Sequence, residues 1–91
     1  MRFDWDDHKA GSNKTKHGIS FEEASKVFYD PNAVTYPDKL HSFDEERFVI
    51  IGYSSLRLLM MVYVEFSDDL IRIISARNAT RSEKKRYEKG E

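Results

Sequence analysis

The feature that most constrains the fold is the second half of the chain, where the apolar residues change from helical spacing to alternation. Residues 47–53, 58–66 and 70–77 are predicted β-strands, separated only by Ser54-Ser55 and Ser67-Asp68-Asp69. Connections this short join antiparallel neighbours. The middle run is apolar on both faces, which is typical of a central strand covered by helices. The sequence therefore predicts an antiparallel meander with this run at its centre.

Two helices are predicted before this sheet. Asp4 or Asp6 can accept the free N–H groups of a first helix running to about Lys16, and Gly18 suits the left-handed position beyond its end. A capping-box pattern, S-F-E-E, opens a second helix that ends at Asp30-Pro31. This pattern pairs Ser20 with Glu23, and the predicted apolar face holds Phe21, Ala24, Val27 and Phe28.

Several shorter segments complete the predicted fold. Residues 1–4 suit a short edge strand, residues 33–36 suit another strand, and the polar loop 37–46 has a length more typical of functional segments than of turns. Thr80 and Glu83 predict a second capping box, opening a terminal helix. The expected architecture is α+β, with two N-terminal helices, an antiparallel sheet of about four strands and a C-terminal helix.

Length and cysteine content exclude several classes of protein. The 91 residues suffice for one domain, spanning 1–91, near the lower limit of size for a stable core. The chain has no cysteine, so a disulfide framework, a thiolate zinc site and a cysteine nucleophile are excluded. Its longest central apolar run falls far short of the roughly 20 residues that span a bilayer. The acidic start MRFDWDD is unlike a signal peptide, so we expect a cytoplasmic protein without membrane association.

Charge is distributed unevenly along the chain. Residues 1–46 hold six Lys and Arg against ten Asp and Glu, a net charge of −4, whereas residues 47–91 hold nine against six, a net charge of +3. Residues 72–89 alone contain seven basic and two acidic residues. A solvated helix end is the ordinary explanation for such a run, but the same charge would attract a polyanion.

Several motifs are similar to those of a known family. They are Trp5-Asp6, Lys16-His17-Gly18, Glu46-Arg47 and RIISAR at 72–77, and the similarity extends over residues 3–90. In these motifs the chain resembles the BrnT ribonuclease toxins of bacterial type II toxin-antitoxin pairs. The resemblance implies a fold like that of the RelE toxins and RNA cleavage that arrests translation. It also implies neutralisation by a small DNA-binding antitoxin similar to BrnA.

The basic junction near the end of the chain suits phosphodiester chemistry. RNA cleavage without a metal uses the ribose 2′-OH as nucleophile and requires a base, an acid and cations that stabilise the phosphorane. Arginine suits the cationic role because its planar fork binds phosphate oxygens in pairs. Arg77 at the end of a strand and Arg81 in the next helix are expected to face a common groove. The resemblance to RelE-like toxins adds Tyr87 as an active-site residue.

Alternation along the last strand separates two of the arginines. Arg72 and Arg77 are five positions apart, so regular alternation places them on opposite faces of the sheet. Arg72 is then equally well explained by an ion pair with Glu46 or Glu65.

Proton transfer has several candidate residues. His17, beside Lys16, is the leading general acid or base, because histidine exchanges a proton near neutral pH. At a helix C-terminus it has an alternative role, binding free carbonyls and complementing the helix dipole. Glu46 is either a base or the ion-pair partner of Arg77. His41, in the long loop, is expected to be solvent-exposed and is a weaker candidate.

The sequence also gives predictions about metals, cofactors and partners. The dispersed histidines give no metal-site pattern, and no cofactor is expected. The expected partners are the antitoxin and RNA, free or on a ribosome, and a dimer of toxin-antitoxin pairs is expected because DNA-binding antitoxins are usually symmetric. The antitoxin is expected to cover residues 77–87 or 38–46. The candidate RNA contacts are Arg47, Arg72, Arg81, Lys84 and Lys85.

Two alternatives to a nuclease stay open. One is a nucleic-acid-binding module without catalysis, which would bind RNA with a steep salt dependence and leave it uncut. The other is an inactive toxin that serves as the scaffold of its antitoxin complex. The net charge of −1 favours this alternative, because it provides little overall attraction for RNA.

Overall fold

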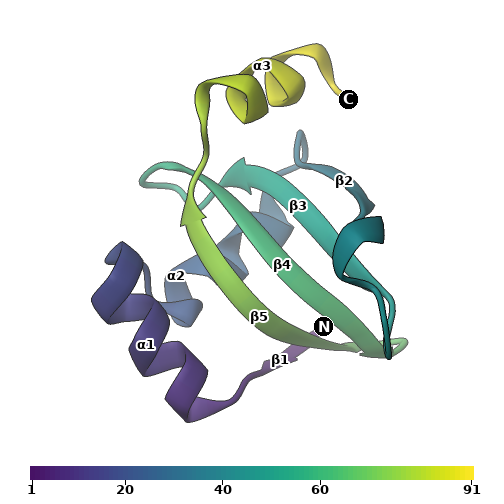
Figure 1. The fold of residues 1–91 in the computed structure, drawn as a ribbon. Helices are drawn as coiled ribbons and strands as arrows, with labels where there is room; N and C mark the ends of the chain where they lie inside the picture. The colour runs from purple at the N-terminus through teal and green to yellow at the C-terminus, as the bar shows by residue number, and fades with distance from the viewer.

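The computed structural model describes residues 1–91 and consists of one twisted sheet with helices on one face and a last helix at its end (Figure 1). The five strands are β1 (Arg2–Asp4), β2 (Val34–Pro37), β3 (Arg47–Tyr53), β4 (Leu58–Ser67) and β5 (Leu70–Asn78). The helices are α1 (Asp7–His17), α2 (Phe21–Ser25) and α3 (Arg81–Lys89), with 3₁₀ turns η1 (Lys26–Tyr29) and η2 (Lys39–His41).

The sheet is mixed rather than purely antiparallel. Its order is β1-β5-β4-β3-β2, so β4 is central, as its apolar sequence predicts. Strand β1 pairs in parallel with β5, where Arg2 lies opposite Leu70. Strands β2 to β5 form the expected antiparallel sheet of four, and the short edge strand expected at residues 1–4 is present. The parallel pairing of that strand with β5, which makes a mixed sheet of five strands, was not expected. A three-residue strand has no clear periodicity, and its distant partner leaves no turn signal between them.

The predicted helix boundaries are largely confirmed. The Asp6 side chain accepts the Lys9 N–H at 2.9 Å, and Gly18 ends α1 with φ 72°. Ser20 accepts the Glu23 N–H at 3.0 Å at the start of α2. The Glu23 side chain does not bond back to the Ser20 N–H, as a full capping box requires. Its carboxylate instead accepts hydrogen bonds from Ser54 and Arg57 in the hairpin joining β3 to β4.

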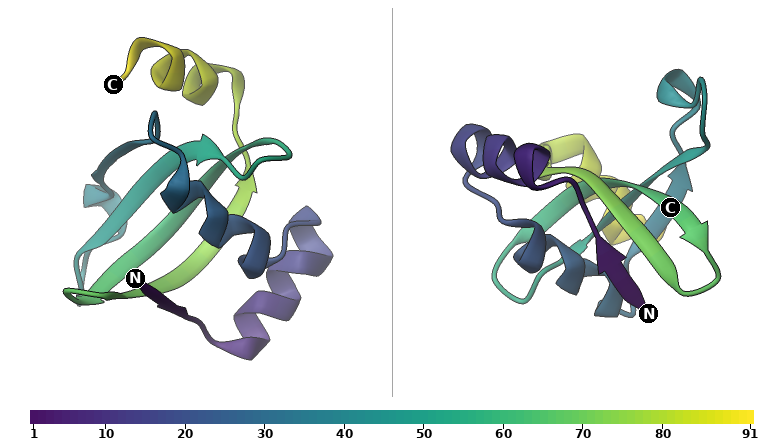
Figure 2. Two further views of the ribbon diagram at one scale, coloured as in Figure 1. Left: turned by 180° about the vertical axis from the view of Figure 1, so that it is seen from behind. Right: turned by 90° about the horizontal axis from the view of Figure 1, so that it is seen from below.

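The main core lies between the sheet and the helices α1 and α2. Figure 2 shows α2 across the face of the sheet that is turned away in Figure 1, and α1 beside the edge formed by β5. Trp5 precedes α1 and packs edge-on against Phe21, with ring centroids 5.9 Å apart. The buried core residues are Ile19, Phe21, Ala24, Val27, Ile50, Leu59, Met61, Tyr63, Ile71, Ile73 and Ala76.

A buried asparagine joins α1 to the sheet. Asn13 Nδ2 donates to the carbonyls of Ile19 and Ala76 at 3.0 and 2.9 Å, and Asn13 Oδ1 accepts the Ala76 N–H at 3.0 Å. The side chain thus satisfies backbone groups that would otherwise be buried without partners.

The opposite face of the sheet lacks a helical layer and is called the open face below. Only α3 crosses one end of it, held by Tyr87, whose ring lies edge-on to Tyr53 at 5.5 Å between centroids. A small apolar cluster centred on Val34, Val49 and Ile51 covers part of this face. None of the helices has the length and apolar character needed to cross a membrane.

Candidate active site

A bulge in β5 places two arginines on the same face. Val64 and Met60 share the open face of β4 and lie opposite Arg72 and Arg77, respectively. The register shifts by one residue between them, which leaves Ile74 as an extra residue in β5. The prediction that Arg72 and Arg77 face opposite sides was wrong, because the bulge changes the count on which alternation depends.

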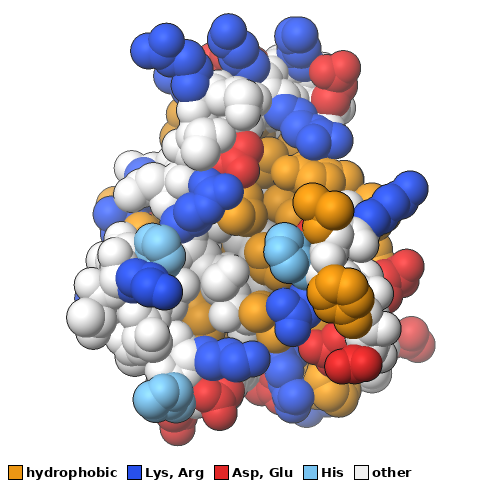
Figure 3. Space-filling view, viewed as in Figure 1, with side chains coloured by type: hydrophobic (Ala, Val, Ile, Leu, Met, Phe, Trp, Pro, Cys, Tyr) orange, Lys and Arg blue, Asp and Glu red, His pale blue; other side chains and the backbone are white.

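A groove of about 380 Å³ crosses the open face, and we call it the open-face groove. In Figure 3 this face carries apolar side chains below α3, with Lys and Arg side chains over α3 and across its lower part. The groove floor is apolar and consists of Val49, Met60, Val62 and Ile74. Its polar lining consists of Tyr36, Asp38, His41, Arg47, Ser75, Arg77 and Glu83.

Arg77 is held in the groove by a carboxylate from α3. Its two terminal nitrogens each donate to one oxygen of Glu83 at 2.9 Å, and one of them also donates to the Asn78 carbonyl. Burial alone would raise the pKa of Glu83, but hydrogen bonds from Arg77 and the Thr80 N–H outweigh it and lower the pKa. The partner of Arg77 is therefore an ionised Glu83, not the predicted Glu46.

Arg47 brings a second guanidinium to the groove. Its Nε atom is buried and has no hydrogen-bond partner, and its terminal nitrogen lies 3.9 Å from a Glu45 oxygen, at the limit of an ion pair. A partly buried cation with an unfilled donor suits an anionic ligand better than a structural ion pair.

The long loop supplies a histidine paired with an aspartate. His41 Nδ1 lies 3.1 Å from both oxygens of Asp38, at the two ends of the turn η2. The Ser42 hydroxyl donates to the Asp38 carbonyl and accepts the Arg47 N–H, which fixes the loop against β3. The His41 side chain is 64% exposed, as expected for this loop. The Asp-x-x-His spacing was the signal in the sequence for its pairing with Asp38.

A family model for the ribonuclease toxin BrnT of type II toxin-antitoxin systems matches residues 5–83 of the chain. The chain belongs to the BrnT family. The crystal structure of the Brucella abortus ribonuclease toxin BrnT is similar to the chain, with a TM-score of 0.69 and 24% sequence identity over 89% of this chain and 99% of that one. That likeness supports the fold. No curated protein matches the chain in sequence.

Tyr87 has a structural contact in this BrnT protein. Its hydroxyl donates to Asp30 Oδ2 at 2.8 Å, and burial, reinforced by Asp30, raises the pKa of Tyr87 to about 12. It does not line the open-face groove. Tyr36 does line the open-face groove, and the guanidinium of Arg86 lies over its ring, 3.7 Å from the centroid.

Arg72 lies toward the other end of β5 and outside the groove lining. Its guanidinium donates to both oxygens of Asp4 at 3.1 and 3.4 Å and lies 4.1 Å from the centroid of the Phe66 ring. The partners expected from the sequence were Glu46 or Glu65. The parallel pairing of β1, for which the sequence has no local signal, brings Asp4 directly opposite Arg72.

The remaining predicted site residues are exposed and lie outside the groove lining. They fall into three places in this BrnT protein: the C-terminal end of α1, the loop before β3, and α3. No three His, Asp or Glu side chains gather into a cluster suited to a metal ion. The residues are Lys16, His17, Glu46, Arg81, Lys84 and Lys85, and their proposed roles stay predictions.

Proposed function

We propose that this BrnT protein is a metal-independent endoribonuclease whose active site is the open-face groove. It acts in the cytoplasm, cuts RNA by attack of the ribose 2′-OH on the adjacent phosphate, and thereby arrests translation. The observation that carries this proposal is the presence of Arg47, Arg77 and the His41–Asp38 pair in one groove.

The two arginines supply the cationic function. Arg47 and Arg77 enter the groove from β3 and β5, with the central strand β4 between them. A scissile phosphate bound between them would be held by charge-assisted hydrogen bonds that strengthen as negative charge develops on the phosphorane. The side chains remain charged throughout the reaction, so they stabilise that charge without exchanging a proton.

His41 supplies proton transfer. Asp38 accepts the hydrogen of Nδ1, which orients the ring and leaves Nε2 able to take or give a proton. The ring exchanges its proton either with the 2′-OH as a base or with the departing 5′-oxygen as an acid. His17, Glu46 and Tyr87 lie outside the groove lining, so we give the proton-transfer role to His41 instead.

The deciding experiment is a cleavage assay with purified protein and end-labelled RNA in EDTA, with and without ribosomes. We expect cleavage that leaves 2′,3′-cyclic phosphate ends. His41→Ala and Arg77→Ala should each lower the rate at least roughly 100-fold with the fold intact. The matched controls His8→Ala and Lys89→Ala should cut RNA like the parent.

Two other results would reject parts of this proposal. Cleavage abolished by EDTA would contradict metal independence. Binding of RNA without any cleavage would leave a nucleic-acid-binding module, the alternative favoured by the occupied guanidinium of Arg77. A requirement for ribosomes would identify ribosome-bound messenger as the substrate.

Membership in a toxin-antitoxin family implies an antitoxin partner and an RNA target. We propose that the antitoxin covers residues 38–46 or 77–87, which border the open-face groove, and that two toxin-antitoxin pairs associate through the antitoxin. Light scattering of the purified complex measures that stoichiometry.

A further inference from the structure

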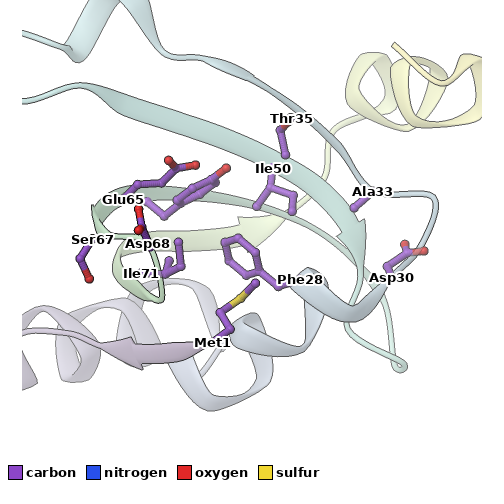
Figure 4. Close-up of a pocket in the computed structure, with 11 residues that line it drawn as sticks. Met1, Phe28, Asp30, Ala33, Thr35, Ile50, Glu65, Ser67, Asp68 and Ile71 are labelled. Carbon is purple, nitrogen blue, oxygen red and sulfur yellow. The ribbon is translucent and has the colours of Figure 1, made fainter.

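A second groove lies on the helix-covered face of the sheet, where α1 and α2 leave it bare. It has a volume of about 630 Å³ and lies between η1, β2 and the hairpin joining β4 to β5. Figure 4 shows Phe28, Ile50 and Ile71 converging on this space. Side chains on β3 and β4 alternate between the two faces, so this groove is back to back with the open-face groove.

The rim of this groove is acidic. Figure 4 shows Asp30 at one end and Glu65 and Asp68 at the other, and none of the lining side chains is basic. Asp30 already accepts hydrogen bonds from the N–H groups of Asn32 and Tyr53. Glu65 and Asp68 take part in no ion pair, so two exposed carboxylates remain free to bind a cation. We call this surface the acidic groove.

A buried tyrosine adds a hydrogen-bonding group to the apolar floor. Tyr63 is 4% exposed and lines the groove. Burial, together with the charge of Glu65, raises the pKa of Tyr63 to about 12, so its hydroxyl keeps its proton. An apolar floor with one hydroxyl and a charged rim is the composition expected of a peptide-binding surface.

We propose that the acidic groove anchors the antitoxin, through a segment that inserts an apolar side chain between flanking Lys or Arg residues. The sign of the charge decides the class of partner, because Glu65 and Asp68 repel RNA phosphates and attract ammonium and guanidinium groups. The floor of Phe28, Ile50 and Ile71 accepts the apolar side chain.

This assignment goes beyond the proposed function. It rests on membership in a toxin-antitoxin family, not on catalysis. The acidic groove would anchor the antitoxin at a different place from the open-face groove that the antitoxin covers, because the two grooves lie on opposite faces of the sheet. An antitoxin that neutralises this toxin by covering the open-face groove must therefore continue around an edge of the sheet.

The test is titration calorimetry of the toxin with its purified cognate antitoxin, at low and high salt. We expect Glu65→Gln combined with Asp68→Asn to weaken binding about tenfold at low salt and to reduce the salt dependence. Thr35→Arg, at an exposed position of the groove wall on β2, should weaken binding about 100-fold by placing a bulky cation in the groove. Glu22→Gln, which removes an exposed carboxylate on α2 outside the groove, is the matched control.

RNA cleavage is measured on the same proteins to separate the two proposals. Weaker antitoxin binding with unchanged RNA cleavage supports the acidic groove as the anchor of the antitoxin. If none of the proteins cuts RNA, the proposed nuclease activity is rejected, but weaker antitoxin binding by the groove variants still supports the anchor. Unchanged binding in both groove variants overturns the anchor. Loss of toxin self-association in Thr35→Arg, with antitoxin binding retained, also overturns it and assigns the groove to a second copy of this chain.

Discussion

At the scale of single residues, Glu83 belongs to two contacts at once. Its carboxylate accepts the Thr80 N–H at 2.8 Å in the capping box of α3 and holds both terminal nitrogens of Arg77. An RNA phosphate that binds Arg77 must therefore compete with a carboxylate already in place.

Glu83→Gln separates these two contacts. Glutamine at this position still completes a capping box, so α3 should keep its start, but the negative charge beside Arg77 is lost. We expect RNA to bind roughly three- to tenfold more tightly at low salt, measured by fluorescence anisotropy. Glu88→Gln, on the same helix, should bind like the parent. Weaker binding by Glu83→Gln would instead mean that Glu83 positions Arg77 for the substrate.

Asn13 is predicted to stabilise the fold through its buried hydrogen bonds. Asn13→Ala leaves the N–H and carbonyl of Ala76 without their partner in a buried position. We expect the free energy of unfolding to fall by about 2–4 kcal/mol in urea titrations. Ser12→Ala, at the neighbouring exposed position, should change it by less than about 0.5 kcal/mol. Equal effects of the two substitutions would contradict this role.

At the scale of elements, the bulge in β5 decides which side chains meet. Residues on either side of Ile74 keep pairing with β4, and only the extra residue breaks the alternation. Removing that residue should therefore leave Arg72 and Arg77 on the same face.

Deletion of Ile74 is the corresponding prediction. We expect a folded protein with RNA binding near that of the parent and a stability loss of about 1–3 kcal/mol from lost contacts in the groove floor. Deletion of Met61, in a regular part of β4, should unfold the protein because it turns buried side chains to the opposite face. Circular dichroism and anisotropy measure both. A folded Ile74 deletion that no longer binds RNA would reject the proposed pairing.

The sequence predicted those elements that carry local signals. The cap at Asp6, the glycine end at Gly18, the capping box at Thr80 and the range 47–53 of β3 all follow from adjacent residues. The parallel pairing of β1 and the bulge depend on partners far along the chain, which no local pattern encodes. The meeting of His41, Arg47 and Arg77 in one groove has the same origin, because it depends on how the long loop folds against β3.

At the scale of the whole molecule, acidic groups link the layers together and make stability depend on pH. Hydrogen bonds from Arg57 lower the pKa of Glu23, which lies 2.8 Å from the Arg57 guanidinium. At Asp30 burial alone would raise the pKa, but donors including the Tyr53 N–H outweigh it and lower the pKa. At Glu83, too, burial alone would raise the pKa, but hydrogen bonds from Arg77 and Thr80 lower it.

Acid should therefore destabilise the protein. A carboxyl group with a lowered pKa in the folded state stabilises the fold above its ordinary pKa of about 4 and loses that contribution as pH falls through the folded-state value. We expect the urea midpoint to be steady near neutral pH and to fall below about pH 4. Glu23→Gln should start less stable and lose less on acidification. A midpoint that does not fall in acid would contradict this account.

The parallel contact between β1 and β5 also has a consequence for the timing of synthesis. Strand β1 is made before the other strands, yet Arg2 pairs with Leu70 and Asp4 pairs with Arg72, so its partner β5 leaves the ribosome after every other strand. A nascent chain cannot close the sheet until that point, because contacts this distant in sequence form late. Arg77 and Glu83 emerge later still. The cell thus has an interval, set by the topology itself, in which the toxin exists as a chain but not yet as a folded groove.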